Sequence, residues 1–117
     1  MPKVVAVLFG IVLMPLCAQA HAILMSSTPA AGVSVPVGKI AMSLRYNSRI
    51  DRARSRLTLT GPDHSQSVLT IRPAGAPDML ESEADLPAPG AYVLHWQVLA
   101  IDGHITRGEV PFTVTGP

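Results

Sequence analysis

The histidines are the side chains of this sequence best suited to chemistry. There are four of them, at His21, His64, His95 and His104. His104 follows Asp102 and Gly103, so a carboxylate and an imidazole stand two residues apart. Side chains at positions i and i+2 of an extended segment point to the same side, which would let Asp102 and His104 share one metal ion. The alternative interpretation is a plain Asp-Gly hairpin turn followed by an exposed histidine.

Residues 1–20 have the features of a signal peptide. Lys3 gives a short positive start, residues 4–16 are almost entirely apolar, and Ala18-Gln19-Ala20 is a small-x-small cleavage site. The apolar run is shorter than the about 20 residues that span a bilayer, and an uncleaved transmembrane anchor is the competing interpretation. We expect cleavage after Ala20, which leaves an exported domain of residues 21–117.

Cleavage at this point would make His21 the first residue of the mature chain. Its free α-amine and its imidazole Nδ1 could then chelate one metal ion, and two nitrogen donors from one residue suit the tetragonal preference of Cu(II). The alternative is that His21 is only a polar chain terminus. Together with Asp102 and His104, His21 would complete a set of three nitrogens and one carboxylate oxygen. We therefore predict one Cu²⁺ ion per chain, bound by His21, Asp102 and His104.

The composition argues against several other functions. Cys17 is the one cysteine and leaves with the signal peptide, so neither disulfides nor thiolate metal sites are expected afterwards. The formal net charge is only +1, which is a poor match for nucleic acid or a membrane surface. The sequence has no nucleophile elbow around a serine and no glycine-rich phosphate loop.

Short strands are the elements expected to position these residues. Apolar and polar residues alternate over residues 40–46, 57–60, 92–98 and 110–114, a pattern typical of half-buried antiparallel strands. Weaker candidates lie near residues 23–26, 67–71 and 79–84. Turns rich in proline and glycine separate these runs, and no stretch of ten residues looks helical. The prediction is an all-β fold, an immunoglobulin-like Greek-key β-sandwich of about seven strands.

Other notable side chains fit ordinary structural roles. His64 lies in a Gly-Pro-Asp-His turn and His95 on the polar face of the 92–98 run, so we expect both to be exposed. The four mature aromatic residues occupy strand positions that predict core packing. The arginines between residues 49 and 56 are expected on a solvated loop and strand face, with a partner-docking patch as the alternative.

Two stretches carry a resemblance to a known family. The expected mature start His21-Ala22 is followed by SSTPAAG at residues 26–32. The block Tyr92-x-Leu94-x-Trp96-x-Val98-x-Ala100-x-Asp102-Gly103-His104 is followed by Gly108, Phe112 and Val114. Both stretches resemble the CopC family of periplasmic copper-binding, copper-resistance proteins.

The resemblance implies a seven-stranded Greek-key sandwich with a type-2 copper site. His21 would be the amine and imidazole ligand, Asp102 a carboxylate ligand, and His104 the second imidazole. The resemblance also implies a role in copper resistance or homeostasis and a membrane copper transporter, here a separate protein, as partner.

Two departures from the family pattern bear on the metal. Ser48 stands where some members have a glutamate near the copper, so a fourth acidic ligand is not expected. Some members have a methionine-rich loop for Cu(I), whereas the corresponding residues 73–90 contain only Met79. Thioether donors are the ligands that hold Cu(I). We therefore predict a protein that binds Cu(II) only.

Two rival functions fit part of the pattern. One is a copper-dependent oxidative enzyme with a histidine brace, resembling polysaccharide monooxygenases, but the aromatic residues are assigned to the core and an anionic Asp102 ligand would stabilise Cu(II). The other is a metal-free immunoglobulin-like interaction module that would use residues 49–56. We favour a periplasmic Cu(II) carrier or buffer. It would be a monomer, not an enzyme, without a nucleic-acid partner or a membrane span after signal cleavage.

Overall fold

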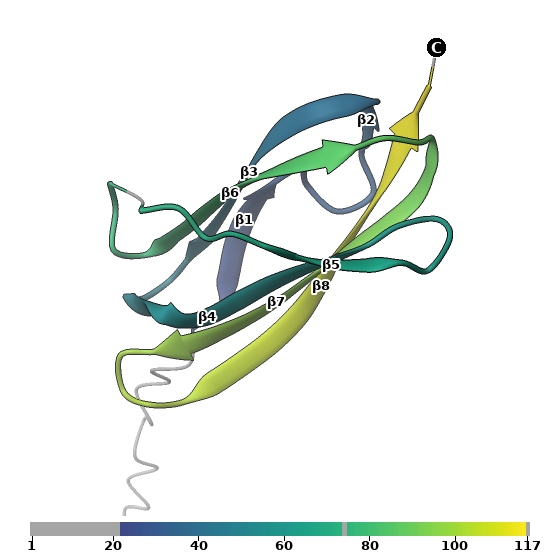
Figure 1. Ribbon diagram of the computed structural model, residues 1–117. Coiled ribbons are helices and arrows are strands. Elements are labelled where there is room, and N and C mark those ends of the chain that lie inside the picture. Colours follow the sequence, from purple (N-terminus) through teal and green to yellow (C-terminus); the bar gives the residue numbers. More distant parts are fainter. Residues whose placement is uncertain (1–21, 74, 117) are drawn as a thin grey trace, which may run out of the picture.

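Strands make up all of the regular structure in the part of the chain that is described. The computed structural model describes residues 22–73 and 75–116, and His21 lies outside them. The eight strands are β1 (Leu24–Thr28), β2 (Ser34–Pro36), β3 (Gly38–Tyr46), β4 (Ile50–Thr60), β5 (Gln66–Leu69), β6 (Met79–Leu86), β7 (Gly90–Ala100) and β8 (Ile105–Thr115) (Figure 1). No helix capable of crossing a membrane occurs among these described residues.

The strands form two sheets that pack face to face (Figure 1). One sheet has the order β1-β3-β6 and the other β2-β8-β7-β4-β5. Every neighbouring pair is antiparallel except β2 and β8, which run parallel. This arrangement confirms the predicted all-β, immunoglobulin-like sandwich. The strand that the sequence did not reveal is β2, which is only three residues long and has no alternating pattern.

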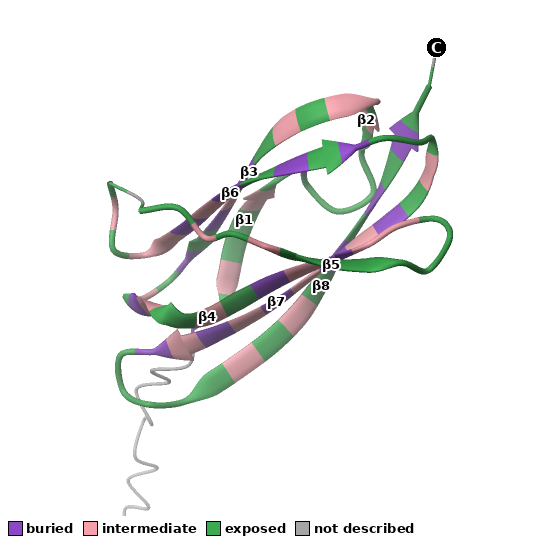
Figure 2. Ribbon diagram, viewed as in Figure 1, coloured by how far each residue is buried: buried purple, intermediate pink, exposed green. Residues whose placement is uncertain are grey.

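The core lies between the sheets and is built from alternate residues of each strand. In Figure 2 buried segments alternate with more exposed ones along β6, β7 and β8, as expected for strands with one face inward. Tyr46 and Trp96 meet edge to face with ring centroids 5.3 Å apart. Tyr92 and Phe112 stack at 5.7 Å. All four aromatic side chains are at most 8% exposed, so their predicted core positions are confirmed.

The arginine-rich segment belongs mostly to a strand. β4 begins at Ile50, and its register with β7 shifts between Asp51 and Arg56. The Ser55 hydroxyl donates a hydrogen bond to the Asp51 carbonyl at 2.6 Å and accepts one from the Leu99 amide at 3.3 Å. Where the register shift interrupts the backbone pairing of β4 with β7, the Ser55 hydroxyl bonds to the Leu99 amide instead. This bond connects the two strands close to the β7–β8 hairpin.

Candidate metal centre

The β7–β8 hairpin holds Asp102 and His104 in contact. The Gly103 amide donates to the Ala100 carbonyl at 2.9 Å, and the Ala100 amide donates to the His104 carbonyl at 2.8 Å. Gly103 has a φ of 90°, a left-handed conformation that glycine adopts at little steric cost. The His104 amide donates to Asp102 Oδ1 at 3.1 Å, and His104 Nδ1 lies 2.6 Å from Asp102 Oδ2. An oxygen and a nitrogen ligand are therefore already side by side.

The reason for this proximity differs from the one expected. The i and i+2 argument assumed an extended segment, whereas residues 101–103 form a turn and β8 begins only at Ile105. The alternative interpretation, a hairpin turn with an exposed histidine, describes the backbone correctly. The turn nevertheless brings the two side chains together, with Asp102 25% and His104 61% exposed. An ion can therefore reach the pair from solvent.

The described chain begins beside this hairpin. Ala22 is 1% exposed, and its carbonyl accepts a hydrogen bond from the Thr106 hydroxyl at 2.9 Å. The Ile23 amide donates to Asn47 Oδ1 at 2.7 Å, and the Asn47 amide donates to the Ile23 carbonyl at 3.0 Å. Hydrogen bonds thus join Ala22 to the start of β8 and Ile23 to the residue that follows β3.

Sequence reasoning did not identify Asn47 and Thr106 as residues of this region. Asn47 is 24 residues from its partner Ile23, and Thr106 is 84 residues from its partner Ala22. Each is an ordinary polar residue near the end of a strand. Since their role depends on which strands become neighbours, no local pattern could have indicated it.

The other described histidines lie elsewhere. His64 is an exposed turn residue with a φ of 66°, as predicted. His95 lies in the middle of β7 and is half-buried, with its Nδ1 3.5 Å from Glu109 Oε1 and its Nε2 3.1 Å from Thr60 Oγ1. Within residues 22–73 and 75–116, no three His, Cys, Asp or Glu side chains form a metal-sized cluster. The hairpin contributes the Asp102–His104 pair, and the third predicted ligand, His21, lies outside the described residues.

The polar pair has apolar neighbours. Ile101 precedes Asp102 and is 69% exposed, and Ile105 follows His104 and is 51% exposed. A shallow groove of about 320 Å³ runs beside the hairpin, lined by apolar residues such as Leu99 and Ile101 and also by Asp51 and Arg54. Apolar surroundings limit the access of water to a metal site and tune the properties of its ligands.

Ser48 lies just beyond β3, and its buried hydroxyl oxygen has no hydrogen-bond partner in the part of the chain that the structure describes. It is the position at which a further acidic ligand was not expected. Because the serine hydroxyl is neutral, Ser48 adds no carboxylate ligand. Asp102 is the carboxylate that contacts His104.

Comparison with known proteins agrees with the fold. Residues 24–115 match the model of the CopC domain. The chain belongs to the CopC family. This confirms the resemblance seen at its two ends and accounts for nearly the whole of the described domain.

Members and neighbours of the CopC family extend the comparison. Protein YobA of Escherichia coli K12 is 31% identical over an alignment of 100 positions that covers 81% of this chain and 79% of YobA. The crystal structure of CopC from Methylosinus trichosporium OB3b superposes with a TM-score of 0.70 at 28% identity, covering 82% of this chain and 95% of that one. PcoC of E. coli, described as a methionine-rich copper resistance protein, shares the fold with a TM-score of 0.63 at 24% identity, over 81% and 99% of the two chains.

Proposed function

We propose that this chain is an exported Cu(II)-binding protein, a carrier or buffer in copper resistance or homeostasis. Its site would be mononuclear and type 2, with one Cu²⁺ held by His21, Asp102 and His104. Cleavage after Ala20 would release the domain into the periplasm and create the amino-terminal histidine. Family membership supports this proposal, as does the description of the similar PcoC as a copper resistance protein.

The observation that carries the proposal is the attachment of Ala22 to Thr106. Thr106 lies two residues after His104, and its hydroxyl holds the carbonyl of the residue that follows His21 in the sequence. His21 is joined directly to Ala22 in the sequence, and Ala22 is the residue that Thr106 holds. The α-amine and imidazole of His21 would form a set of three nitrogens and one oxygen with Asp102 and His104.

The separation of the paired donor atoms suits a single ion. Two atoms bound cis to one first-row divalent ion at about 2.0 Å lie about 2.8 Å from each other. His104 Nδ1 and Asp102 Oδ2 are 2.6 Å apart. Both atoms could bind one copper ion if the imidazole and the carboxylate turned from their direct contact toward it, with release of any proton that they share. Metal binding with loss of a proton is the usual behaviour of such ligands.

The described methionines support Cu(II) in preference to Cu(I). Met42 is buried in the core at 1% exposed, whereas Met25 is 64% exposed on β1. Met79 is the first residue of β6. The three therefore lie on different strands or faces, and Cu(I) needs soft thioether donors gathered at one point.

A binding role is favoured over an oxidative enzyme. The described aromatic side chains are all in the core, so they do not form the flat aromatic surface used to hold a polysaccharide. Asp102 would add negative charge to the copper and stabilise Cu(II) against reduction. We propose a monomer that exchanges copper with a separate membrane transporter, and the exposed isoleucines beside the hairpin would contact it.

Substitution of the hairpin ligands tests the proposal. We expect His104→Ala and Asp102→Asn each to weaken Cu(II) binding by more than about 100-fold, since even residues that only orient a ligand contribute 10- to 100-fold. The measurement is a titration with Cu(II) against a competing chelator, after far-ultraviolet circular dichroism has shown that each variant is folded. His64→Ala is the matched control, because that histidine is exposed in a distant turn. Equal loss of affinity in the control would refute the assignment.

A further inference from the structure

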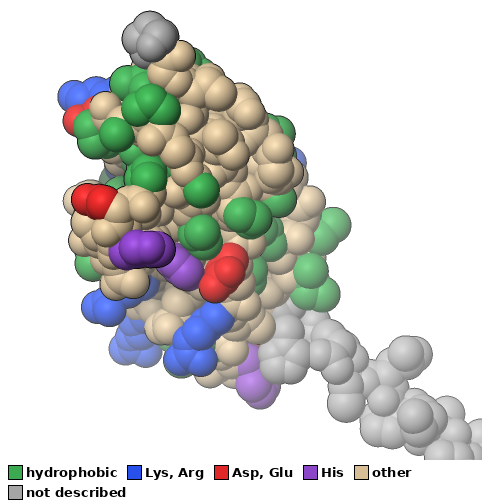
Figure 3. Space-filling model, turned by 90° about the vertical axis from the view of Figure 1, so that its right-hand side faces the viewer, with side chains coloured by type: hydrophobic (Ala, Val, Ile, Leu, Met, Phe, Trp, Pro, Cys, Tyr) green, Lys and Arg blue, Asp and Glu red, His purple; other side chains and the backbone are tan. Residues whose placement is uncertain are grey.

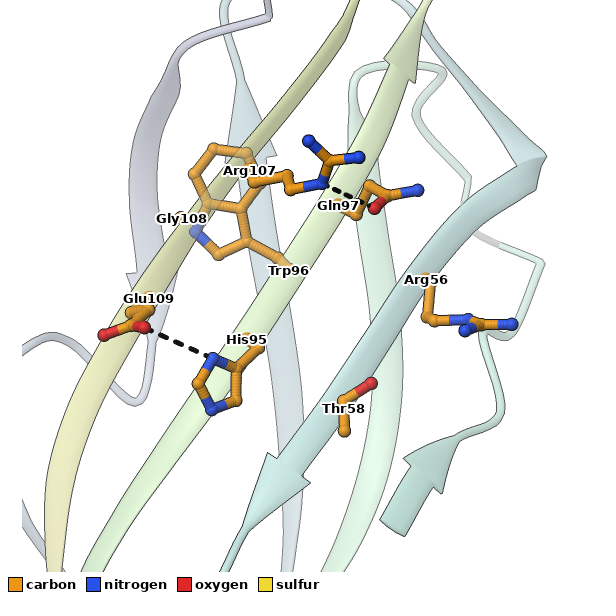
Figure 4. Close-up of a pocket in the computed structure, with 8 residues that line it drawn as sticks. All are labelled: Arg56, Thr58, His95, Trp96, Gln97, Arg107, Gly108 and Glu109. Atoms are coloured by element: carbon orange, nitrogen blue, oxygen red, sulfur yellow. Dashed lines mark hydrogen bonds and ion pairs between the residues drawn. The ribbon is translucent and has the colours of Figure 1, made fainter. Parts of the chain in front are cut away.

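The outer face of the five-stranded sheet carries a charged groove separate from the hairpin. Figure 3 shows basic, acidic and histidine side chains gathered on one face of the molecule. The groove measures about 420 Å³ and lies over β4, β7 and β8 (Figure 4). This volume falls within the range of about 300–1,000 Å³ that is usual for small-molecule sites.

The strand register arranges the side chains of this groove in two rows. Arg56 of β4 pairs with Gln97 of β7, which pairs in turn with Arg107 of β8. The second row consists of Thr58, His95 and Glu109 in the same strand order. Since neighbouring strands lie about 4.8 Å apart, the backbones that carry the two arginines are about 10 Å apart.

The two arginines have no anionic partner within the described residues. Glu109 lies 3.5 Å from His95, and no ion pair joins a carboxylate to Arg56 or Arg107. Arg107 donates instead to the neutral Gln97 Oε1 through its Nε at 2.8 Å. Figure 4 shows Arg107 reaching over β7 toward Gln97 from one side, with Arg56 on β4 at the other. The groove is therefore bordered by two exposed arginines with a neutral amide between them, and the Glu109 carboxylate lies in the second row.

The floor of the groove is held in place by the core. Gly108 and Trp96 are partners in the β7–β8 ladder, and both line the groove. The indole packs so closely against Gly108 that an added Cβ would come within 2.3 Å of Trp96 Cζ2. Trp96 is only 8% exposed, so its indole is packed in the core beneath the groove. A preformed floor reduces the ordering cost when a ligand binds.

We propose that this groove binds a small anion with at least two carboxylates. Arg56 and Arg107 would each take one carboxylate, and the planar guanidinium group matches a carboxylate with two parallel hydrogen bonds. The amide nitrogen of Gln97 is positioned to donate a further hydrogen bond, because Arg107 engages the oxygen of that amide. The distance between the arginine-bearing strands selects a ligand with two separated anionic groups over one with a single group. This site uses none of the proposed copper ligands.

The test is a titration of metal-free, isotope-labelled protein with succinate, followed by nuclear magnetic resonance. Acetate at equal ionic strength is the single-carboxylate comparison. We expect saturable shifts in the amides of residues 95–97 and 107–109 and in the Arg56 side chain. Succinate should bind at least about tenfold more tightly than acetate, because the second charge-assisted contact adds to the first.

Variants identify the residues responsible. Arg56→Gln and Arg107→Gln should each reduce succinate binding to the level of acetate. Arg72→Gln is the matched control, since Arg72 is an exposed arginine already paired with Glu83 at 3.6 Å, and it should bind succinate as the parent protein does. The proposal is overturned by the absence of saturable shifts, or by equal loss in the Arg72 variant. Binding of an acidic peptide in the groove without binding of succinate would also overturn it and assign the groove to a protein partner.

Discussion

The Asp102–His104 contact shows what a single pair of residues contributes to this molecule. The carboxylate accepts a hydrogen bond from the His104 amide and lies 2.6 Å from its ring nitrogen, so one aspartate orients both the backbone and the imidazole. A ligand ring held in this way loses less conformational freedom when it binds a metal. The residue types and their spacing were visible in the sequence, and the turn that joins them was recognised there only as the alternative to a shared metal site.

Two tyrosines provide opposite tests of how buried hydroxyls affect stability. The Tyr46 hydroxyl is buried with no hydrogen-bond partner among the described residues, whereas the Tyr92 hydroxyl donates to the Ala88 carbonyl at 2.7 Å. We expect Tyr46→Phe to raise the free energy of unfolding by about 1 kcal/mol and Tyr92→Phe to lower it by a similar amount. Urea denaturation followed by circular dichroism measures both. Destabilisation by Tyr46→Phe as large as that by Tyr92→Phe would contradict this account.

The same tyrosine predicts a loss of stability at alkaline pH. Burial raises the pKa of Tyr46 well above its ordinary value of about 10. Above about pH 10 the unfolded chain releases this proton while the folded chain retains it, so the free energy of unfolding falls as pH rises. Tyr46→Phe should lose less stability than the parent protein over this range. An identical alkaline slope in the two proteins would show that other groups cause the loss.

At the scale of elements, β7 and β8 form the structural frame of the site. They make the longest ladder in the molecule, which runs from Gly90 opposite Val114 to Leu99 opposite Ile105. The hairpin with Asp102 and His104 is one end of this ladder. Because Trp96 pairs with Gly108 a few residues away, packing in the core beneath the ladder bears directly on the position of the hairpin.

Gly108 is required by the close approach of the Trp96 indole. An alanine Cβ at this position would lie 2.3 Å from Trp96 Cζ2 and 2.6 Å from Cε2. We expect Gly108→Ala to reduce the free energy of unfolding by about 1–3 kcal/mol, the usual cost of overpacking a core. Thermal denaturation and tryptophan fluorescence are the measurements. Gly75→Ala is the control, since nothing lies within 4 Å of its added Cβ. An unchanged melting temperature for Gly108→Ala would contradict the packing argument.

Thr106 connects strand β8 to the amino-terminal end of the described chain. We expect Thr106→Val to weaken Cu(II) binding by about tenfold, since residues that position ligands contribute 10- to 100-fold to metal affinity. The substitution removes the hydroxyl that holds the Ala22 carbonyl but retains the shape of the side chain. Competition titration gives the affinity. Thr113→Val, an exposed position on the same strand, should bind copper normally. Normal binding by Thr106→Val would remove the anchoring role proposed for this residue.

At the scale of the whole molecule, the sequence predicted the fold better than the details of the site. Alternation of apolar residues revealed β3, β4, β7 and β8, since one face of each packs in the core. β2 escaped notice because three residues are too few for a period of two to be visible. β2 is joined to β8 by parallel pairing, and that partner is fixed only in the folded chain.

The candidate site was predictable only in part. Asp102 and His104 are neighbours in the sequence, so their proximity could be anticipated from spacing. The anchoring of Ala22 by Thr106 and of Ile23 by Asn47 joins residues far apart in the chain. The charged groove over β4, β7 and β8 likewise exists only after three strands pair in one register. The residue pattern within one strand does not show which residues of the neighbouring strands will pair with it.

The most direct test of the central claim compares two forms of the protein that differ only at the amino terminus. One begins at His21, confirmed by mass spectrometry, and the other has a single extra residue before it. Each is titrated with Cu(II) and examined by electron paramagnetic resonance. We predict one tightly bound ion per chain with an axial spectrum and nitrogen coupling for the first form, and weakened binding with an altered spectrum for the second. Identical affinity and spectra in the two forms would contradict chelation by the α-amine and imidazole of His21.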